Sequence, residues 1–222
     1  MDNLIDKIPN LEIEIFGGSK SSIKRIKGFV TLSAWSGFQS RQGSYASVDQ
    51  ATPSDGNIKL AVGGDMLVDD PVVTQEHVNA YNFLVTDQEK IRDSILNSLL
   101  AKYPDLQELY DYDPETAADI MPDVDKLSQF KSLIGLSNIH LMNVSKDGVA
   151  YVGYEFGCTW DDEHGLGVMT YKDRVIEIGG ADVSFLTWVA EKDLKPKKTN
   201  DANAPGEAPI TPKSNKPWWK FW

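Results

Sequence analysis

The sequence predicts an α+β fold, with an antiparallel meander sheet, helices packed on one face of it, and a flexible C-terminal tail. Three observations lead to this prediction. The first is a series of four strand-like segments between residues 137 and 178, separated by tight turns. The second is a helical pattern in the middle of the chain, over residues 74–133. The third is an abrupt change of composition after Trp188.

The first 62 residues have the pattern of β-strands. Residues 11–15 alternate apolar side chains with glutamates, which is the two-residue period of a half-buried strand. Further strands are expected over residues 28–35 and 58–62, because both segments are rich in apolar and β-branched side chains. Residues 36–57 contain many turn formers and are expected to form a long connection.

The middle of the chain predicts helices. Thr74 stands where an N-cap residue is expected, and apolar side chains at positions 91, 95 and 99 have helical spacing. The helix is expected to end at Tyr103, because Pro104 disfavours the helical conformation in the residue before it. A short helical piece is expected at residues 106–110. An acidic stretch with prolines follows at residues 111–125, and a last helix is expected at residues 126–133.

The last third of the chain is expected to form the meander. Its turn signals are Asp147-Gly148, which favours a two-residue hairpin, and Lys172-Asp173. The strands on either side of these turns are expected at residues 137–144, 149–156, 166–171 and 174–178. The organisation that follows is one domain over residues 1–189, a disordered linker over 190–217 and an aromatic motif at 218–222.

Composition and charge exclude several classes of protein. No apolar stretch approaches the roughly 18–20 residues of a membrane-spanning helix, and the N-terminus lacks the features of a signal peptide. The single cysteine, Cys158, suits a reducing compartment, so we expect a cytoplasmic protein. The net charge of the chain is −11; residues 190–222 carry seven Lys and four acids, which leaves 15 basic and 29 acidic side chains, a net −14, in the first 189 residues. Such a body repels nucleic acid and attracts basic proteins, although solubility alone also explains the charge.

One loop between two predicted strands concentrates reactive side chains. They are a thiol, an indole, three carboxylates and an imidazole: Cys158, Trp160, Asp161, Asp162, Glu163 and His164. A zinc site is one interpretation, but no second His or Cys stands at a recognisable spacing. Catalysis is another, but neighbouring side chains diverge in a tight loop, whereas a nucleophile and its base must come within hydrogen-bond reach.

A structural role for this loop is the interpretation that we favour. Trp160 would fill the core, and Asp161 or Asp162 would accept backbone N–H groups across the turn. His164 would bridge to a neighbouring strand, and the two glycines that follow would permit close backbone approach. The exposed carboxylates then remain available to a partner. We therefore assign no catalytic residue and expect neither a metal nor another cofactor.

The C-terminus carries a separate signal. Its four aromatic side chains are Trp218, Trp219, Phe221 and Trp222. With only two lysines beside them, they predict weak or no membrane contact. Aromatic anchors dominate peptide interfaces, so docking of this motif into a pocket is the better interpretation, either on a partner or on the protein itself.

Three segments carry a family resemblance. The first is Phe-Gly-Cys-x-Trp-Asp-x-Glu-His-Gly-Leu-Gly-Val at residues 156–168, and the others are residues 74–96 and 172–182. On these segments the chain resembles a bacterial family of uncharacterised domains, over about residues 10–186. The resemblance implies no catalytic mechanism. Its members are similar in style to immunity proteins of bacterial toxin systems, small acidic α+β proteins that neutralise a toxin by binding it.

Together these features predict a non-enzymatic cytosolic binding protein, immunity-like, that neutralises or regulates a basic protein such as a toxin or effector through its acidic surface. The candidate binding residues are Trp160, Asp161, Asp162, Glu163 and His164 of the loop, and Trp218, Trp219, Phe221 and Trp222 of the tail. Two alternatives stay open. One is a metal-assisted hydrolase that uses Asp161, Glu163 and His164, and the other is an adaptor docked through its Trp-rich C-terminus.

Overall fold

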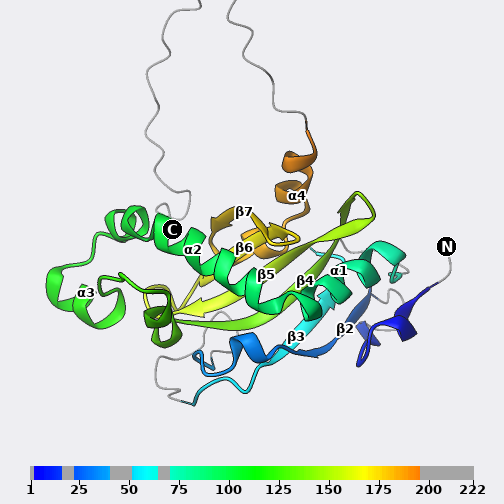
Figure 1. Cartoon of the computed structure of the whole chain (residues 1–222), viewed down its shortest axis with the longest axis horizontal. Coiled ribbons are helices and arrows are strands. Elements are labelled where there is room, and N and C mark those ends of the chain that lie inside the picture. Colours follow the sequence, from blue (N-terminus) through cyan, green and yellow to red (C-terminus); the bar gives the residue numbers. More distant parts are fainter. Residues whose placement is uncertain (1–2, 17–22, 41–51, 65–70, 196–222) are drawn as a thin grey trace, which may run out of the picture.

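A seven-stranded sheet forms the centre of the computed structural model, which describes residues 3–16, 23–40, 52–64 and 71–195 (Figure 1). The strands lie side by side in chain order: β1 (Glu12–Phe16), β2 (Ile23–Thr31), β3 (Asn57–Val62), β4 (Ile134–Lys146), β5 (Val149–Cys158), β6 (Leu166–Tyr171) and β7 (Arg174–Gly179). All neighbours are antiparallel except β3 and β4, which are parallel. The α+β class and the meander of the last four strands are therefore confirmed, whereas the sheet as a whole is mixed.

The predicted hairpin turns form as expected. Asp147 and Gly148 both have positive φ, 48° and 73°, as a two-residue turn that matches the twist of its strands requires. They join Lys146 directly to its cross-strand partner Val149. Lys172, between β6 and β7, also has a positive φ of 54°.

The second strand lies earlier in the chain than predicted. It ends at Thr31, and the short 3-10 helix η2 (Ser33–Trp35) follows instead of further strand. The cause is the packing of Trp35, which is buried against Phe38 and Phe156 at ring-centroid distances of 5.1 and 5.2 Å. Burial of a large aromatic side chain outweighs the local preference for extended backbone.

The helical middle begins as predicted and ends later. Thr74 is the N-cap of α1 (Gln75–Thr86), and α2 (Gln88–Tyr110) runs through Pro104. The prediction of an end at Tyr103 is wrong because tertiary contacts hold this turn: the buried Tyr103 ring lies 5.4 Å from Phe130 and 5.5 Å from Trp160. The remaining helical elements of this region are α3 (Pro114–Ile120) and the 3-10 helix η3 (Leu127–Ser132), which replaces the predicted last helix.

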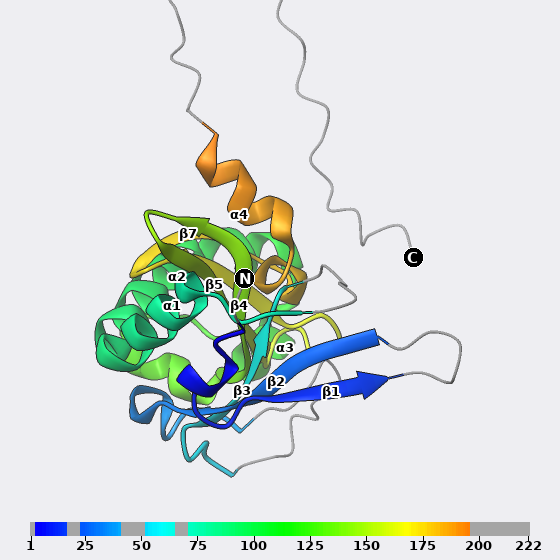
Figure 2. The same cartoon turned by 90° about the vertical axis from the view of Figure 1, so that its right-hand side faces the viewer.

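Helices lie on both faces of the sheet, which corrects the prediction of a single covered face. The side chains of β5 alternate, so Val152 and Tyr154 join the main core with α1 and α2, and Tyr151 joins a smaller core on the other face. Val189 and Ala190 of α4 fill that smaller core. Figure 2 shows α4 apart from α1 and α2, with β4 and β5 between them.

The predicted linker also begins too early, at residue 190. The elements after β7 are the 3-10 helix η4 (Ala181–Ser184) and α4 (Thr187–Leu194), so residues 190–194 are helical. The aromatic motif and residues 196–217 lie outside the described residues. None of the helices in the described ranges has the length and apolar character needed to cross a lipid bilayer.

A buried histidine makes stability depend on pH. His77 is 2% exposed, its Nδ1 accepts the N–H of Thr74 at 3.0 Å, and its Nε2 lies 3.0 Å from the carbonyl oxygen of Met142. Burial lowers the pKa of His77 below its usual 6.5. The unfolded chain therefore binds the proton more tightly, so the contribution to stability is complete above pH about 6.5 and is lost as the pH falls below it.

We expect the free energy of unfolding to fall between pH 6.5 and 5 by at most about 1.4 kcal/mol per pH unit from this group. Urea unfolding at a series of pH values measures the slope. In His77→Gln the slope over this range should become shallower, although the variant is less stable at every pH. An unchanged slope would contradict the assignment to His77.

Candidate functional site

The loop singled out in the sequence forms a rigid corner between β5 and β6, which we call the signature corner (residues 157–165). Trp160 is 2% exposed, and its ring meets that of Tyr103 edge to face, at an interplanar angle of 76°. The indole therefore fills the core, as the structural interpretation predicted, and is not available on the surface for binding.

Asp161 holds the corner together. Its Oδ1 accepts the backbone N–H of His164 at 2.7 Å and lies 3.2 Å from His164 Nδ1, while its Oδ2 accepts the hydroxyl of Tyr110 at 2.6 Å. The carboxylate is only 10% exposed. Burial, together with the neighbouring Asp161 carboxylate, raises the pKa of Tyr110 far above its usual value, so this phenol stays a hydrogen-bond donor.

Further hydrogen bonds tie the corner to the helical segment beside it. The hydroxyl of Tyr112 donates to the carbonyl oxygen of Trp160 at 2.7 Å, and Thr159 Oγ1 donates to the carbonyl oxygen of Ile120. The rings of Tyr110 and Tyr112 stack, with centroids 5.8 Å apart. The end of α2, α3 and the signature corner thus form one continuous structure.

The thiol and the imidazole of the signature corner both make their contacts within the corner. Cys158 is fully buried, and its thiol donates to the carbonyl oxygen of Asp161 at 3.4 Å. The ring of His164 pairs with Asp161, which differs from the predicted bridge to a neighbouring strand. The carbonyl oxygen of His164 accepts the N–H of Ala181 at 3.2 Å. Within residues 3–16, 23–40, 52–64 and 71–195, no three His, Cys, Asp or Glu side chains are grouped as ligands for a metal ion.

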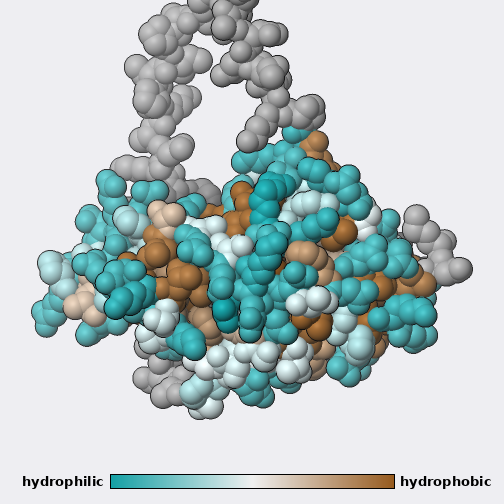
Figure 3. Space-filling view, in the orientation of Figure 1, coloured by the Kyte–Doolittle hydropathy of each residue, from teal (hydrophilic) through white to brown (hydrophobic). Residues whose placement is uncertain are grey.

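Exposed carboxylates gather around this corner. Residues 103–125 contain eight acidic side chains and no Lys or Arg. The exposed acids of this region and of the corner are Asp105, Glu108, Asp111, Asp113, Glu115, Asp119, Asp123, Asp125, Asp162 and Glu163. We call residues 105–125 and 161–163 the acidic end. It includes α3 at the left of Figure 1, and mostly hydrophilic residues cover that side in Figure 3.

A second candidate site, missed in the sequence, lies on the open face of the N-terminal half of the sheet. This sheet hollow has a volume of about 870 Å³ and is lined mainly by β1, β2, β3 and β4. His140 and Glu155 form its least exposed polar pair, with Nε2 and Oε2 3.1 Å apart and side chains 14% and 18% exposed. The ring of Phe185 lies 5.6 Å from that of His140.

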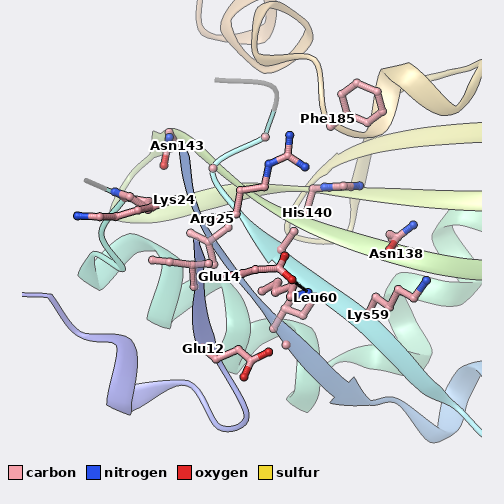
Figure 4. A pocket seen from close by; sticks show the side chains of 18 of the residues that line it. Glu12, Glu14, Lys24, Arg25, Lys59, Leu60, Asn138, His140, Asn143 and Phe185 are labelled. Atoms are coloured by element: carbon pink, nitrogen blue, oxygen red, sulfur yellow. Dashed lines mark hydrogen bonds and ion pairs between the residues drawn. The ribbon is translucent and has the colours of Figure 1, made fainter. Parts of the chain in front are cut away.

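The sheet hollow contains charges of both signs. Its cationic side chains are Lys24, Arg25, Lys27 and Lys59, and its carboxylates are Glu12, Glu14 and Glu155. Figure 4 shows how side chains of β1, β2, β3 and β4 approach the same space. Because Lys27 and Glu14 already pair with each other, and His140 with Glu155, the hollow does not select one class of ligand.

Of the residues predicted for binding, the structure brings Trp160, Asp161 and His164 together in the signature corner and leaves Asp162 and Glu163 exposed. The four aromatic residues predicted in the tail lie outside the described residues: Trp218, Trp219, Phe221 and Trp222. The sequence did not indicate that the acidic stretch after α2 would lie beside the corner.

Comparison with known proteins gives a family and no function. Neither the curated proteins nor the solved structures contain a match to this chain. One family model matches residues 28–186, a range that contains the signature corner and excludes β1 and α4. Since the match covers more than half of the chain, the protein belongs to the family described as Domain of unknown function (DUF6985).

Proposed function

We propose that the protein is a non-enzymatic binding protein whose acidic end holds a basic protein partner. The observation that carries the proposal is the set of ten exposed carboxylates around α3 and the signature corner, with no Lys or Arg in residues 103–125. A surface of one charge sign attracts a partner of the opposite sign and speeds their encounter.

Rigidity supports this proposal. The hydrogen bonds of Tyr110 to Asp161 and of Tyr112 to Trp160 hold the corner against the helices, so the backbone segments that carry the exposed carboxylates are joined to each other. A preorganised surface loses less conformational entropy on binding than a flexible one. The C-terminus of α2, which points to the same end, adds the negative pole of its helix dipole.

Within this proposal we place the protein in the cytoplasm and assign it a neutralising or regulating role, in the style of an immunity protein. The support is its net charge of −11, the single buried cysteine and the α+β architecture. The partner class that follows is a basic toxin or effector protein. Nucleic acid is disfavoured, because the acidic end repels phosphates.

Charge reversal tests the proposal. In the triple variant Glu108→Lys, Asp162→Lys, Glu163→Lys, we expect the affinity for the partner to fall at least about tenfold, roughly 1.4 kcal/mol. The matched control is Asp6→Lys, Glu89→Lys, Glu191→Lys, which changes the net charge equally at exposed positions away from the acidic end. Both variants and the unchanged protein serve as immobilised baits for lysate of the source cells, at low and at high salt, with quantitative mass spectrometry.

The expected result is a basic protein retained at low salt by the unchanged bait and by the control, and lost by the acidic-end variant. Weaker retention at high salt should accompany it, because salt screens exposed charges. Equal loss in both triple variants would show that only net charge matters, and retention of no protein would remove the proposal.

A further inference from the structure

An apolar pocket lies between the signature corner and the end of α2. This corner pocket has a volume of about 240 Å³. Its walls are mainly apolar: Leu106, Leu109, Tyr110, Trp160, Leu166 and Ala181. The volume is below the range of about 300–1,000 Å³ for pockets that hold drug-sized ligands. A pocket of this size suits a single large side chain rather than a larger ligand.

Carboxylates mark the rim of this pocket. Asp161 and Asp182 line it, and the exposed Asp162 and Glu163 follow directly in the chain. The cation among the lining residues, Lys102, donates its Nζ to the carbonyl oxygen of Ile178 at 2.7 Å. An occupant of complementary chemistry is therefore a large apolar side chain with positive charge beside it and an N–H that a carboxylate can accept.

The chain itself ends in such a segment. Its last seven residues are Lys216-Pro217-Trp218-Trp219-Lys220-Phe221-Trp222. They combine three indoles, each with an N–H donor, one phenyl ring and two lysines. The whole stretch of residues 190–222 has a net charge of +3, opposite to that of the acidic end.

The connection is long enough to reach the pocket. Residues 196–217 separate the described part of the chain from Trp218, which is 22 residues. Fully extended they span about 75 Å, and as a flexible coil about 26 Å on average. A folded unit of this size has a radius of gyration of about 16 Å. Tethering at this length gives an effective concentration in the millimolar range, so a weak contact suffices for occupancy.

Charge separates the corner pocket from the larger sheet hollow. Four cationic side chains and three carboxylates line the sheet hollow, so its charges do not favour a basic segment. The corner pocket instead presents a carboxylate rim and lies at the acidic end. Apolar walls and charge complementarity therefore favour the same place.

We propose that residues 216–222 dock within the same molecule into the corner pocket, with one aromatic side chain inserted and the lysines over the rim carboxylates. The inference does not depend on the proposed function, because it needs no partner protein. It gives the Trp-rich terminus a site on this chain instead of on another molecule.

Paramagnetic labelling of the full chain tests the proposal. The single native cysteine, Cys158, is fully buried, so Ser214→Cys adds the reactive thiol to which a nitroxide is attached. We expect the backbone amides of Leu109, Gly165 and Gly180 to lose more than half of their NMR peak intensity relative to the reduced sample. Amides beside the sheet hollow, such as that of Asn138, should keep theirs.

Two further variants are each made in the labelled Ser214→Cys chain. Replacing all four aromatic residues of the segment by alanine should restore the intensities, and Ala181→Leu, which fills the pocket from its wall, should do the same. In a separate sample, labelled chain of natural isotopic content is mixed with ¹⁵N-labelled chain that lacks the new thiol. Here the intensities should be unaffected, because docking is intramolecular.

Three results would overturn the proposal. Loss of intensity in the mixed sample would assign the segment to a second copy of the chain. Loss spread evenly over the surface, or unchanged by the alanine variant, would show a tail without a preferred site. Full intensity everywhere would leave the terminus free to recruit another molecule, as an adaptor does.

Discussion

Trp160→Ala should lower the free energy of unfolding by about 3–5 kcal/mol, the usual cost of removing a large buried aromatic side chain. The indole is 2% exposed and fills the space beside Tyr103, so its loss leaves a cavity under the signature corner. The corner would then lose the support on which the rigidity of the acidic end depends. Urea unfolding followed by circular dichroism measures the change.

The matched control is Glu163→Ala, three positions along the same corner. Its side chain is exposed, so its replacement should change stability by less than about 0.5 kcal/mol. Trp160→Phe should fall between the two, because it keeps part of the apolar volume. If Trp160→Ala were as stable as Glu163→Ala, the structural role of the corner would be refuted.

Gly153→Ala should cost at least about 3 kcal/mol, because the added methyl group has no space. A Cβ atom at this position would lie 1.5 Å from the backbone carbonyl oxygen of Ser184, where η4 crosses the face of β5. Since backbone atoms are in the way, no change of side-chain rotamer relieves the clash. Thermal and urea unfolding of the variant both measure the loss.

Gly148→Ala is the control for this change. Gly148 has a positive φ of 73°, but nothing lies within 4 Å of an added Cβ. Its replacement should cost only the left-handed backbone penalty of about 1–2 kcal/mol. Similar losses in the two variants would mean that η4 does not lie tightly against β5.

Local signals predicted much of the fold, and distant contacts account for the errors. The turns at Asp147-Gly148 and Lys172-Asp173 set the meander, because a tight turn determines the pairing of its own strands. No turn signal predicts the parallel pairing of β3 with β4, because residues 63–133 separate these two strands in the chain. The continuation of α2 through Pro104 likewise depends on rings of Phe130 and Trp160, which the local sequence does not show.

In the candidate sites, too, local signals predicted the residues that act within one loop, and contacts between distant segments were missed. The place of Trp160 in the core was predicted from residue type and position. An aspartate that accepts a backbone N–H across the turn was also predicted, but the sequence left Asp161 and Asp162 open, and the structure assigns this role to Asp161. The partners Tyr110 and Tyr112 were not predicted, because they come from a segment about 50 positions earlier in the chain.

The pairing of His140 with Glu155 in the sheet hollow could have been predicted from the strand register. Counting back in regular register from the Asp147-Gly148 turn places His140 directly opposite Glu155. Irregularities shift the observed register by two residues, so that His140 faces Gly153. A shift by an even number keeps both side chains on one face, where they still meet diagonally.

The parallel seam between β3 and β4 has a consequence for biogenesis. During synthesis β1, β2 and β3 emerge long before β4, and the three helices of residues 75–120 must be made in between. Until then one edge of β3, with the apolar side chains Ile58, Leu60 and Val62, has no neighbour on the nascent chain. Unpaired apolar edges promote association with other chains. This protein therefore most needs a chaperone during the stage of synthesis at which β3 has been made and β4 has not.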